Sequence, residues 1–245
     1  MAGQQVDTDF VGGIPGFDLV EAISALEAID HWFMASADTC TIEDGKIAAF
    51  VDLLNPSTVT MDQATAGQRA ILDDEQIGTW PAAQFVKADG VQYLLTGATF
   101  DPTTPFCVIS DFRRRDANLE NSVVAGCSSS CYWGFVGSSA TNFLFRWGSA
   151  TITAPVTVDD WHWFIADYDG VNIRLSVDGG AVQSTAAIGA PSTPGALVWG
   201  NTTSGSAGNK FDGQGTDLIV GSGAVLADPT ARDLFRQYFA GTLGI

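Results

Sequence analysis

Residues 160–180 contain the pattern that most restricts the fold of this chain. Apolar and polar residues alternate on both sides of Tyr168-Asp169-Gly170, and a second turn sequence follows at Asp178-Gly179-Gly180. Alternation of this kind between Asp-Gly turns is a strong local signal for a β-hairpin. The segment therefore predicts two antiparallel strands, with one face of each strand turned toward a core.

The length and composition of the chain suit one large all-β domain. The chain has 245 residues, of which 46% are hydrophobic and 27 are glycine. Sandwiches of this size commonly form a single domain, and many tight turns need glycine. We expect a two-sheet antiparallel β-sandwich over residues 31–245, with helices outside it at both ends.

The first 30 residues differ from the rest of the chain. Residues 1–16 show no periodicity and are predicted to form an arm. Apolar residues then recur at helical spacing from Asp18 to Ile29, which predicts a helix. We expect residues 1–30 to serve docking or oligomerisation.

A second helix is predicted near the C-terminus. Asp228 is placed to cap it, Pro229 suits its first turn, and Gly241 and Gly244 are expected to end it. One face of this helix is apolar and is expected to pack on the sandwich; it consists of Ala231, Leu234, Phe235, Tyr238 and Phe239.

Charge argues against two classes of partner. The net charge is −17, with only eleven Lys and Arg residues. Such a surface repels phosphate backbones and anionic lipids, so neither nucleic acid nor a membrane is an expected partner. No stretch has the apolar length of a membrane span, and no secretory signal is recognised at the N-terminus. The cluster Arg113–Arg115 is interpreted as a salt-bridged strand edge, or alternatively as a docking point for an acidic neighbour.

The sequence predicts a protein that is not an enzyme. Retaining glycosidases need two carboxylates across a cleft, and no Glu-x-Asp-x-Glu strand is present. Asp73-Asp74-Glu75 is consecutive and is interpreted as a solvated loop. The two histidines, His31 and His162, have no Gly-x-Ser-x-Gly nucleophile motif beside them, and His162 is expected to be a packed or hydrogen-bonded strand residue.

Seven tryptophans suggest a surface for stacking on sugars. Trp32, Trp161 and Trp163 are assigned to the core. Trp199 and Trp133 are the candidate ligand-binding residues, and Trp199 is the better candidate for exposure because a Gly- and Ser-rich loop follows it. Core packing of both is the alternative, since tryptophan is highly buried on average.

The spacing of the four cysteines matches no known metal-binding motif. Cys127 and Cys131 are predicted to lie at a hairpin tip, either as free thiols, which we favour, or bridged to each other. Their spacing fits no zinc site, and no metal ligand set is assigned.

Several short motifs also occur in a recognisable order. They are Trp32-Phe33-Met34-Ala35-Ser36-Ala37-Asp38, Gln63-Ala64-Thr65 with Arg69, Pro81-Ala82-Ala83-Gln84-Phe85, Asp89-Gly90, Tyr93-Leu94, Trp161-His162 and Phe211-Asp212-Gly213. Together they resemble the laminin-G-like, or concanavalin A-like, jelly-roll domains found in bacteriophage virion proteins. The resemblance runs from about Trp32 to Ile245. It does not include the N-terminal arm, the first helix or Arg113–Arg115.

The resemblance implies a non-enzymatic virion component, namely a decoration, head-fibre or tail-associated protein exposed on the particle. Its partners would be other virion proteins, contacted through the arm, further copies of itself, and a host surface glycan. A lectin or glycan-active enzyme outside a virion is the alternative. Many such domains bind calcium, and Asp167, Asp169, Asp178 and Asp212 are the residues at rim positions here. Asp-Gly turns explain Asp169 and Asp178 without a metal.

Overall fold

A computed structural model describes residues 19–77, 80–115, 122–135, 141–191, 196–202 and 210–244. The arm expected at residues 1–16 lies outside the described residues, so its role stays a prediction. The described chain consists mainly of antiparallel strands, with two α-helices and two short 3-10 helices, Ala66–Gln68 and Lys87–Asp89. This confirms the predicted all-β class.

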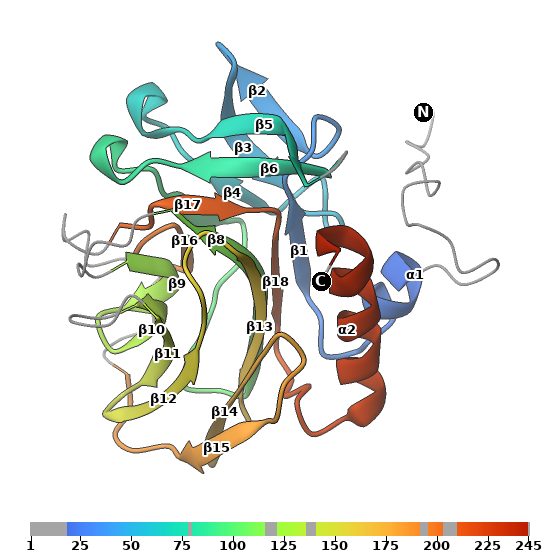
Figure 1. The fold of residues 1–245 in the computed structure, drawn as a ribbon, viewed down its shortest axis with the longest axis vertical. Coiled ribbons are helices and arrows are strands. Elements are labelled where there is room, and N and C mark those ends of the chain that lie inside the picture. Colours follow the sequence, from blue (N-terminus) through green and yellow to red (C-terminus); the bar gives the residue numbers. More distant parts are fainter. Residues whose placement is uncertain are drawn as a thin grey trace.

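Six strands form the sheet that carries both α-helices, which we call sheet I (Figure 1). In spatial order they are β15 (Gln183–Ala186), β14 (Asn172–Val177), β13 (Trp161–Tyr168), β8 (Phe106–Arg114), β18 (Asp217–Gly221) and β1 (His31–Met34). The predicted hairpin is β13–β14, with Phe164 opposite Val177. Asp178 and Gly179 after β14 both have positive φ angles, 51° and 65°, as the Asp-Gly turn prediction requires.

The opposing layer, sheet II, is built from shorter strands. In spatial order they are β12 (Ala150–Pro155), β11 (Asn142–Trp147), β10 (Cys131–Phe135), β9 (Ser122–Ser128), β16 (Val198–Trp199), β7 (Tyr93–Thr96), β4 (Thr60–Asp62), β3 (Lys46–Val51) and β2 (Cys40–Glu43). Three further strands, β5 (Ile71–Ile77), β6 (Trp80–Phe85) and β17 (Gly213–Gly215), connect β3 to β8 and so join the two sheets at one side.

Two apolar cores result from this arrangement. The main core lies between the sheets, and a second core lies between sheet I and the helices. Strand β13 supplies both, because Phe164 and Ala166 face the main core while Trp163 and Ile165 face the helices. Alternation along β13 therefore gives this strand two buried faces, and its first residue, Trp161, is only partly buried.

Helix α2 (Pro229–Leu243) covers the outer face of sheet I (Figure 1). Asp228 Oδ1 accepts a hydrogen bond from the Thr230 backbone N–H at 2.8 Å, which confirms the predicted cap. All five residues of the predicted apolar face are buried. Gly244 ends the helix in the left-handed conformation at φ 68°, whereas Gly241 lies inside the helix rather than at its end.

Other predictions need correction. Helix α1 (Leu19–Ser24) is shorter than the predicted span of residues 18–29, although it lies outside the sandwich as predicted, where it packs beside α2. Asp73-Asp74-Glu75 belongs to β5 rather than to a loop. The arginine cluster is not at a sheet edge, since β8 is paired on both sides and Arg114 is buried with its guanidinium 4.4 Å from the centre of the Phe135 ring. None of the described helices is long and apolar enough to cross a membrane.

Candidate functional site

A hollow of about 600 Å³ opens at the rim of sheet I, where β13 begins. The turn after β14 and the middle of α2 form its other walls. Hydrogen-bonding side chains and two tryptophans dominate the lining, which includes Arg113, Thr157, Asp160, Trp161, Trp163, Asp178 and Arg236. The volume lies in the range of small-ligand sites.

His162 fixes the wall of this hollow by joining two segments. Its Nδ1 lies 2.7 Å from Asp178 Oδ2, and its Nε2 lies 3.1 Å from the backbone nitrogen of Thr157. A backbone N–H can only donate, so Nε2 accepts and the ring proton is assigned to Nδ1, which donates to Asp178. Asp178 also accepts from the Trp163 backbone N–H at 3.0 Å. This confirms His162 as a hydrogen-bonded strand residue.

The same residues approach the arrangement of a nucleophilic triad. Thr157 Oγ1 lies 3.0 Å from His162 Nε2, and His162 in turn contacts Asp178. However, the Nε2 lone pair already accepts the backbone N–H of Thr157, and the Thr157 hydroxyl lies closer to Asp160 Oδ2, at 2.6 Å. The geometry therefore suits a rigid turn better than removal of a proton from Thr157.

Trp161 is the aromatic residue at the mouth of the hollow. It is partly exposed, and it lies opposite Arg113 in the pairing of β13 with β8. Arg113 Nε donates to the carbonyl oxygen of Asp159 at 2.7 Å, and the Asp159 N–H donates to the Arg114 carbonyl at 2.9 Å. The loop before β13 is thus held against β8, and the pairing of Trp161 with Arg113 puts their side chains on the same face of sheet I. Our sequence analysis assigned Trp161 to the core, and it does pack against the second core, but its place in the lining of the hollow was not predicted.

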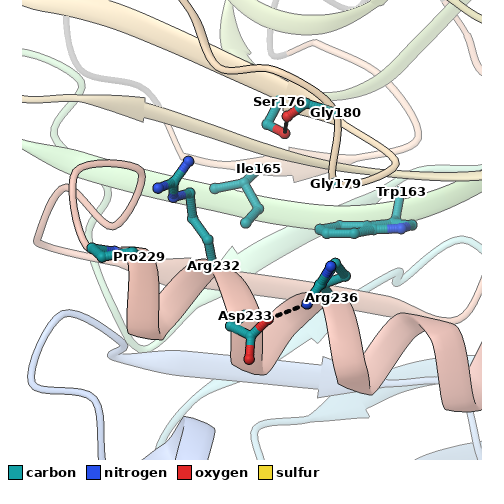
Figure 2. A pocket seen from close by; sticks show the side chains of 9 residues that line it. All are labelled: Trp163, Ile165, Ser176, Gly179, Gly180, Pro229, Arg232, Asp233 and Arg236. Atoms are coloured by element: carbon teal, nitrogen blue, oxygen red, sulfur yellow. Dashed lines mark hydrogen bonds and ion pairs between the residues drawn. The ribbon is translucent and has the colours of Figure 1, made fainter.

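A second hollow of about 260 Å³ adjoins the first, between α2 and the β13–β14 hairpin (Figure 2). Trp163 and Arg236 line both hollows. Trp163 stacks on Phe239 of α2 with ring centres 4.9 Å apart, and Arg236 pairs with Asp233 on the same helix. The wall that the two hollows share therefore consists of a stacked aromatic pair on one side and a surface ion pair on the other.

Both candidate tryptophans from the sequence lie in the main core. Trp199 and Trp133 are each 0% exposed. Trp199 packs against Phe50 and Phe85, with ring centres 4.8 and 5.3 Å away, and Trp133 stacks on Phe145. The expected exposure of Trp199 is wrong, because β16 lies between β7 and β9 in the middle of sheet II. A ring covered on both faces offers no surface to a sugar.

The four rim aspartates considered for calcium do not gather at one place. Asp167 is buried and binds Arg174 at 2.7 and 3.1 Å, and it accepts the Leu226 N–H at 2.6 Å. Asp169 caps the β13–β14 turn, Asp178 binds His162, and Asp212 lies before β17. Within the described residues, no three His, Cys, Asp or Glu side chains are grouped closely enough to hold a metal ion.

The cysteines are all free thiols. Cys127 and Cys131 lie on either side of the β9–β10 turn, and the Cys127 thiol is 3.7 Å from the Cys131 carbonyl oxygen. Burial raises the pKa of the Cys131 thiol well above its ordinary value. A thiol of this kind is unreactive as a nucleophile.

A pair of carboxyl groups is sealed beneath α2, away from the hollow. Asp111 on β8 and Asp217 on β18 are both 0% exposed, and the hydroxyl of Thr216 contacts both carboxyl groups. Asp217 also accepts from Trp32 Nε1 at 2.7 Å and from the Tyr238 hydroxyl at 3.2 Å. Burial and the neighbouring charge of Asp217 raise the pKa of Asp111 to about 7, and burial raises that of Asp217 to about 6.

The charges around the larger hollow nearly cancel. Arg113 and Arg236 face three carboxylates, Asp159, Asp160 and Asp178. In a chain of net charge −17, this is a region of mixed rather than uniform charge. Such a surface offers both donors and acceptors without a strong field of either sign.

No protein-family model and no curated protein sequence matches this chain. Solved structures do match in fold. The binding domain of Paraclostridial Mosquitocidal Protein 1 aligns with a TM-score of 0.61 and 12% identity over 89% of this chain and 53% of that one. Domain 4 of AbnA, an extracellular GH43 arabinanase from Geobacillus stearothermophilus solved with arabinotriose, gives a TM-score of 0.55 and 13% identity over 84% of this chain and 98% of that domain.

A sialidase from Trypanosoma rangeli, in complex with the inhibitor DANA, also aligns, with a TM-score of 0.58 and 10% identity over 89% of this chain. This chain spans about a third of the sialidase and about half of the mosquitocidal binding domain. At these identities the likeness concerns the fold alone. The chain has the β-sandwich fold that these binding domains and carbohydrate-active proteins contain.

Proposed function

We propose that this chain is a non-enzymatic, outward-facing component of a bacteriophage virion that binds glycans in the groove beside Trp161. The observation that carries the binding proposal is a partly exposed tryptophan in a 600 Å³ hollow lined with arginine, aspartate and threonine side chains. The site is therefore the rim of sheet I, and not Trp199 or Trp133.

The chemistry of this groove suits a sugar. The face of an indole packs well on the apolar face of a pyranose or furanose ring, and the indole edge stays polar. Sugar hydroxyls both donate and accept, so they match arginine donors placed beside aspartate acceptors. Because the local charges nearly cancel, we expect a neutral glycan rather than a sulfated or sialylated one. The arabinanase domain with the same fold was solved with a neutral sugar, arabinotriose.

Absence of catalysis is part of the proposal. The closely coupled carboxyl pair, Asp111 and Asp217, is covered by α2 and cannot meet a substrate. The His162 ring nitrogen that a nucleophile would need is occupied by a backbone N–H. Binding without turnover is the expected behaviour, and incubation of the protein with each glycan that it binds should leave that glycan intact in mass spectrometry.

Replacing Trp161 with alanine should remove most of the binding. Loss of a stacked aromatic ring is worth about 1–2 kcal/mol, so we expect affinity to fall roughly tenfold or more. The measurement is binding of the wild type and the variant to a printed array that carries arabinan, glucan, mannan, galactan and N-acetylglucosamine series from monomer to hexamer, with sialylated and sulfated glycans included.

The matched control is Leu94→Ala, which truncates an exposed apolar side chain on β7 of sheet II, outside the groove lining. The unfolding temperature of each variant must show that it is folded. A wild-type protein that binds nothing on the array would refute the glycan proposal, and preferential binding to sulfated or sialylated glycans would refute the neutral class. Binding to a neutral glycan should change little between low and high salt.

The virion part of the proposal rests on the order of motifs from Trp32 to Phe211-Asp212-Gly213. We expect the chain to be present on particles made by its source genome, in several symmetric copies, with its first 30 residues contacting other virion proteins. Cryo-electron microscopy of purified particles tests this. Absence of the chain from particles would leave a free lectin as the interpretation, whatever the outcome of the glycan array.

A further inference from the structure

Arg113 is anchored at the larger hollow through its Nε atom alone. Nε donates to the Asp159 carbonyl oxygen at 2.7 Å, and Arg113 lines the hollow together with Trp161. Neither terminal nitrogen of Arg113 has a hydrogen-bond or ion-pair partner among the residues that the structure describes. A guanidinium group holds its N–H donors in one rigid plane, so the anchored side chain still has an edge with two parallel donors.

Asp159, which anchors Arg113, has a strained backbone. Its φ angle is 67°, in the left-handed region, and no glycine follows it, so an Asp-Gly turn does not explain this conformation. Its N–H donates to the Arg114 carbonyl oxygen at 2.9 Å, and its own carbonyl oxygen accepts from Arg113. Strain of this kind persists where the surrounding contacts impose it, and here those contacts fix the position of the Arg113 guanidinium.

Asp160 supplies an acceptor in the same lining. It is exposed, and its Oδ2 accepts from the Thr157 hydroxyl at 2.6 Å, which orients the carboxylate. Its Oδ1 has no hydrogen-bond partner within the described part of the chain. A sugar hydroxyl can accept from a guanidinium N–H and donate to a carboxylate at the same time. The lining therefore combines a two-donor edge, one acceptor and the ring of Trp161.

We propose that Arg113 selects neutral sugars that carry two adjacent free hydroxyl groups. The sugar ring lies on Trp161, each terminal nitrogen of Arg113 donates to one of the two hydroxyl oxygens, and one of these hydroxyls donates to Asp160 Oδ1. Two adjacent hydroxyl oxygens match the two-donor edge as the oxygens of a carboxylate would, but they bring no charge to a hollow lined by three carboxylates. The inference rests on the proposed glycan-binding function and adds the recognised feature of the sugar and the residue that recognises it.

The test titrates the protein by NMR with the methyl glycosides of arabinose, glucose, mannose, galactose and N-acetylglucosamine. The glycoside that binds best is then compared with its monodeoxy derivatives, one for each ring hydroxyl. Removal of either of two adjacent hydroxyls should lower the affinity about tenfold, which is the effect of one hydrogen bond to a charged group, and removal of any other should change it less than about threefold. Sensitivity at no position, or only at positions that are not adjacent, would overturn the proposal.

Arg113→Lys keeps the positive charge and removes the two-donor edge. It should lower the affinity for the parent glycoside about tenfold and should bind the two sensitive deoxy derivatives as tightly as the parent. Arg146→Lys is the matched control, because Arg146 on β11 also donates its Nε to a carbonyl oxygen, that of Gly148 at 3.2 Å, and lies outside the lining of the hollow. This control should keep the wild-type affinities for the parent and for every derivative.

Two variants of Asp159 separate the role of its backbone from that of its carboxylate. Asparagine tolerates a positive φ angle, so Asp159→Asn should bind as the wild type does. A β-branched residue does not, so Asp159→Val should release Arg113 and lower the affinity as far as Arg113→Lys does. Unfolding temperatures must show that each variant is folded, and if Asp159→Val is not, the Arg113→Lys result decides.

The outcomes distinguish this inference from glycan binding as such. An Arg113→Lys variant that matches the Arg146→Lys control would overturn the role of Arg113 and leave glycan binding beside Trp161 intact. Binding on the printed array by a protein that binds none of the methyl glycosides would do the same. A wild-type protein that binds no glycoside and nothing on the array would overturn both proposals together.

Discussion

The protein should become less stable as the pH rises from 5 to 8, by roughly 4 kcal/mol in the free energy of unfolding. The cause is the Asp111–Asp217 pair. Both carboxyl groups have folded-state pKa values above the ordinary aspartate value, about 7 and about 6, so the folded chain holds protons that the unfolded chain has released. Stability is therefore lost as the pH rises through these values. Urea unfolding at a series of pH values measures the effect.

Below pH 4 the trend should reverse. Hydrogen bonds from His31, the Trp32 backbone N–H and Asn55 lower the pKa of Asp52 despite its burial, so its contribution is lost as the pH falls through that lowered value. The stability maximum should thus lie at about pH 4, where the two contributions meet. Carboxyl groups with lowered pKa values change the stability only in the acidic range, so a loss of stability between pH 5 and 8 is diagnostic of the sealed pair.

Asp217→Asn is the variant that isolates the effect. It removes one of the two charges and lets the pKa of Asp111 fall, so the loss of stability between pH 5 and 8 should shrink to less than half. Asp233→Asn, at a partly exposed aspartate of α2 that pairs with Arg236, is the matched control and should keep the wild-type slope. An unchanged slope in Asp217→Asn would contradict the assignment.

Trp199→Ala should cost about 3–5 kcal/mol of stability, because it empties the centre of the main core. The indole is fully buried and contacts Phe50 and Phe85, whose rings cannot close the space without moving β3 and β6. Urea or thermal unfolding of the variant measures this loss. Trp161→Ala, at a partly exposed position, should lose less than half as much stability and should instead lose binding.

Trp199→Phe provides the control at the same site. It keeps an aromatic ring and removes an indole N–H that has no hydrogen-bond partner, so its cost should be well below that of alanine. If Trp199→Ala remained as stable as the wild type and lost glycan binding, the indole would be a ligand contact after all, and the core assignment would be wrong.

The elements that the sequence predicts well are those whose signals are local. The β13–β14 hairpin, its Asp-Gly turns and helix α2 with its Asp228 cap all depend on residues close together in the chain. Helix α1 was overestimated because apolar spacing continues to Ile29, although the helix stops at Ser24 and Ile29 is buried by tertiary packing alone. The spacing of apolar residues indicates which residues are buried, but it is a weaker guide to whether they belong to a helix.

The candidate site at the rim of sheet I was not predictable in the same way. Its lining comes from β8, the loop before β13, the turn after β14 and α2, and only the pairing of distant strands brings Arg113 beside Trp161. Alternation placed Trp161 on the same face as the buried Trp163, and it does lie there. What alternation does not give is how completely α2 covers that face: Trp163 stacks on Phe239 of α2 and is buried, whereas Trp161 stays partly exposed. The neighbouring Asp159-Asp160 was the one local sign that Trp161 begins a strand at the rim.

Strands β1 and β18 pair directly although they are far apart in the chain, and the hydrogen bond from Trp32 to Asp217 joins residues 185 positions apart. Pairings between strands so far apart in the chain slow folding, because the entropy of the long intervening segment must be lost before the pairing contributes any stability. During synthesis from the N-terminus, β8 has no neighbour on its β18 side until residue 221 has left the ribosome. Trp32 and Phe33 stay uncovered for the same interval. Folding of sheet I is therefore a late event, and shielding of this early apolar segment during translation becomes a requirement for good yield.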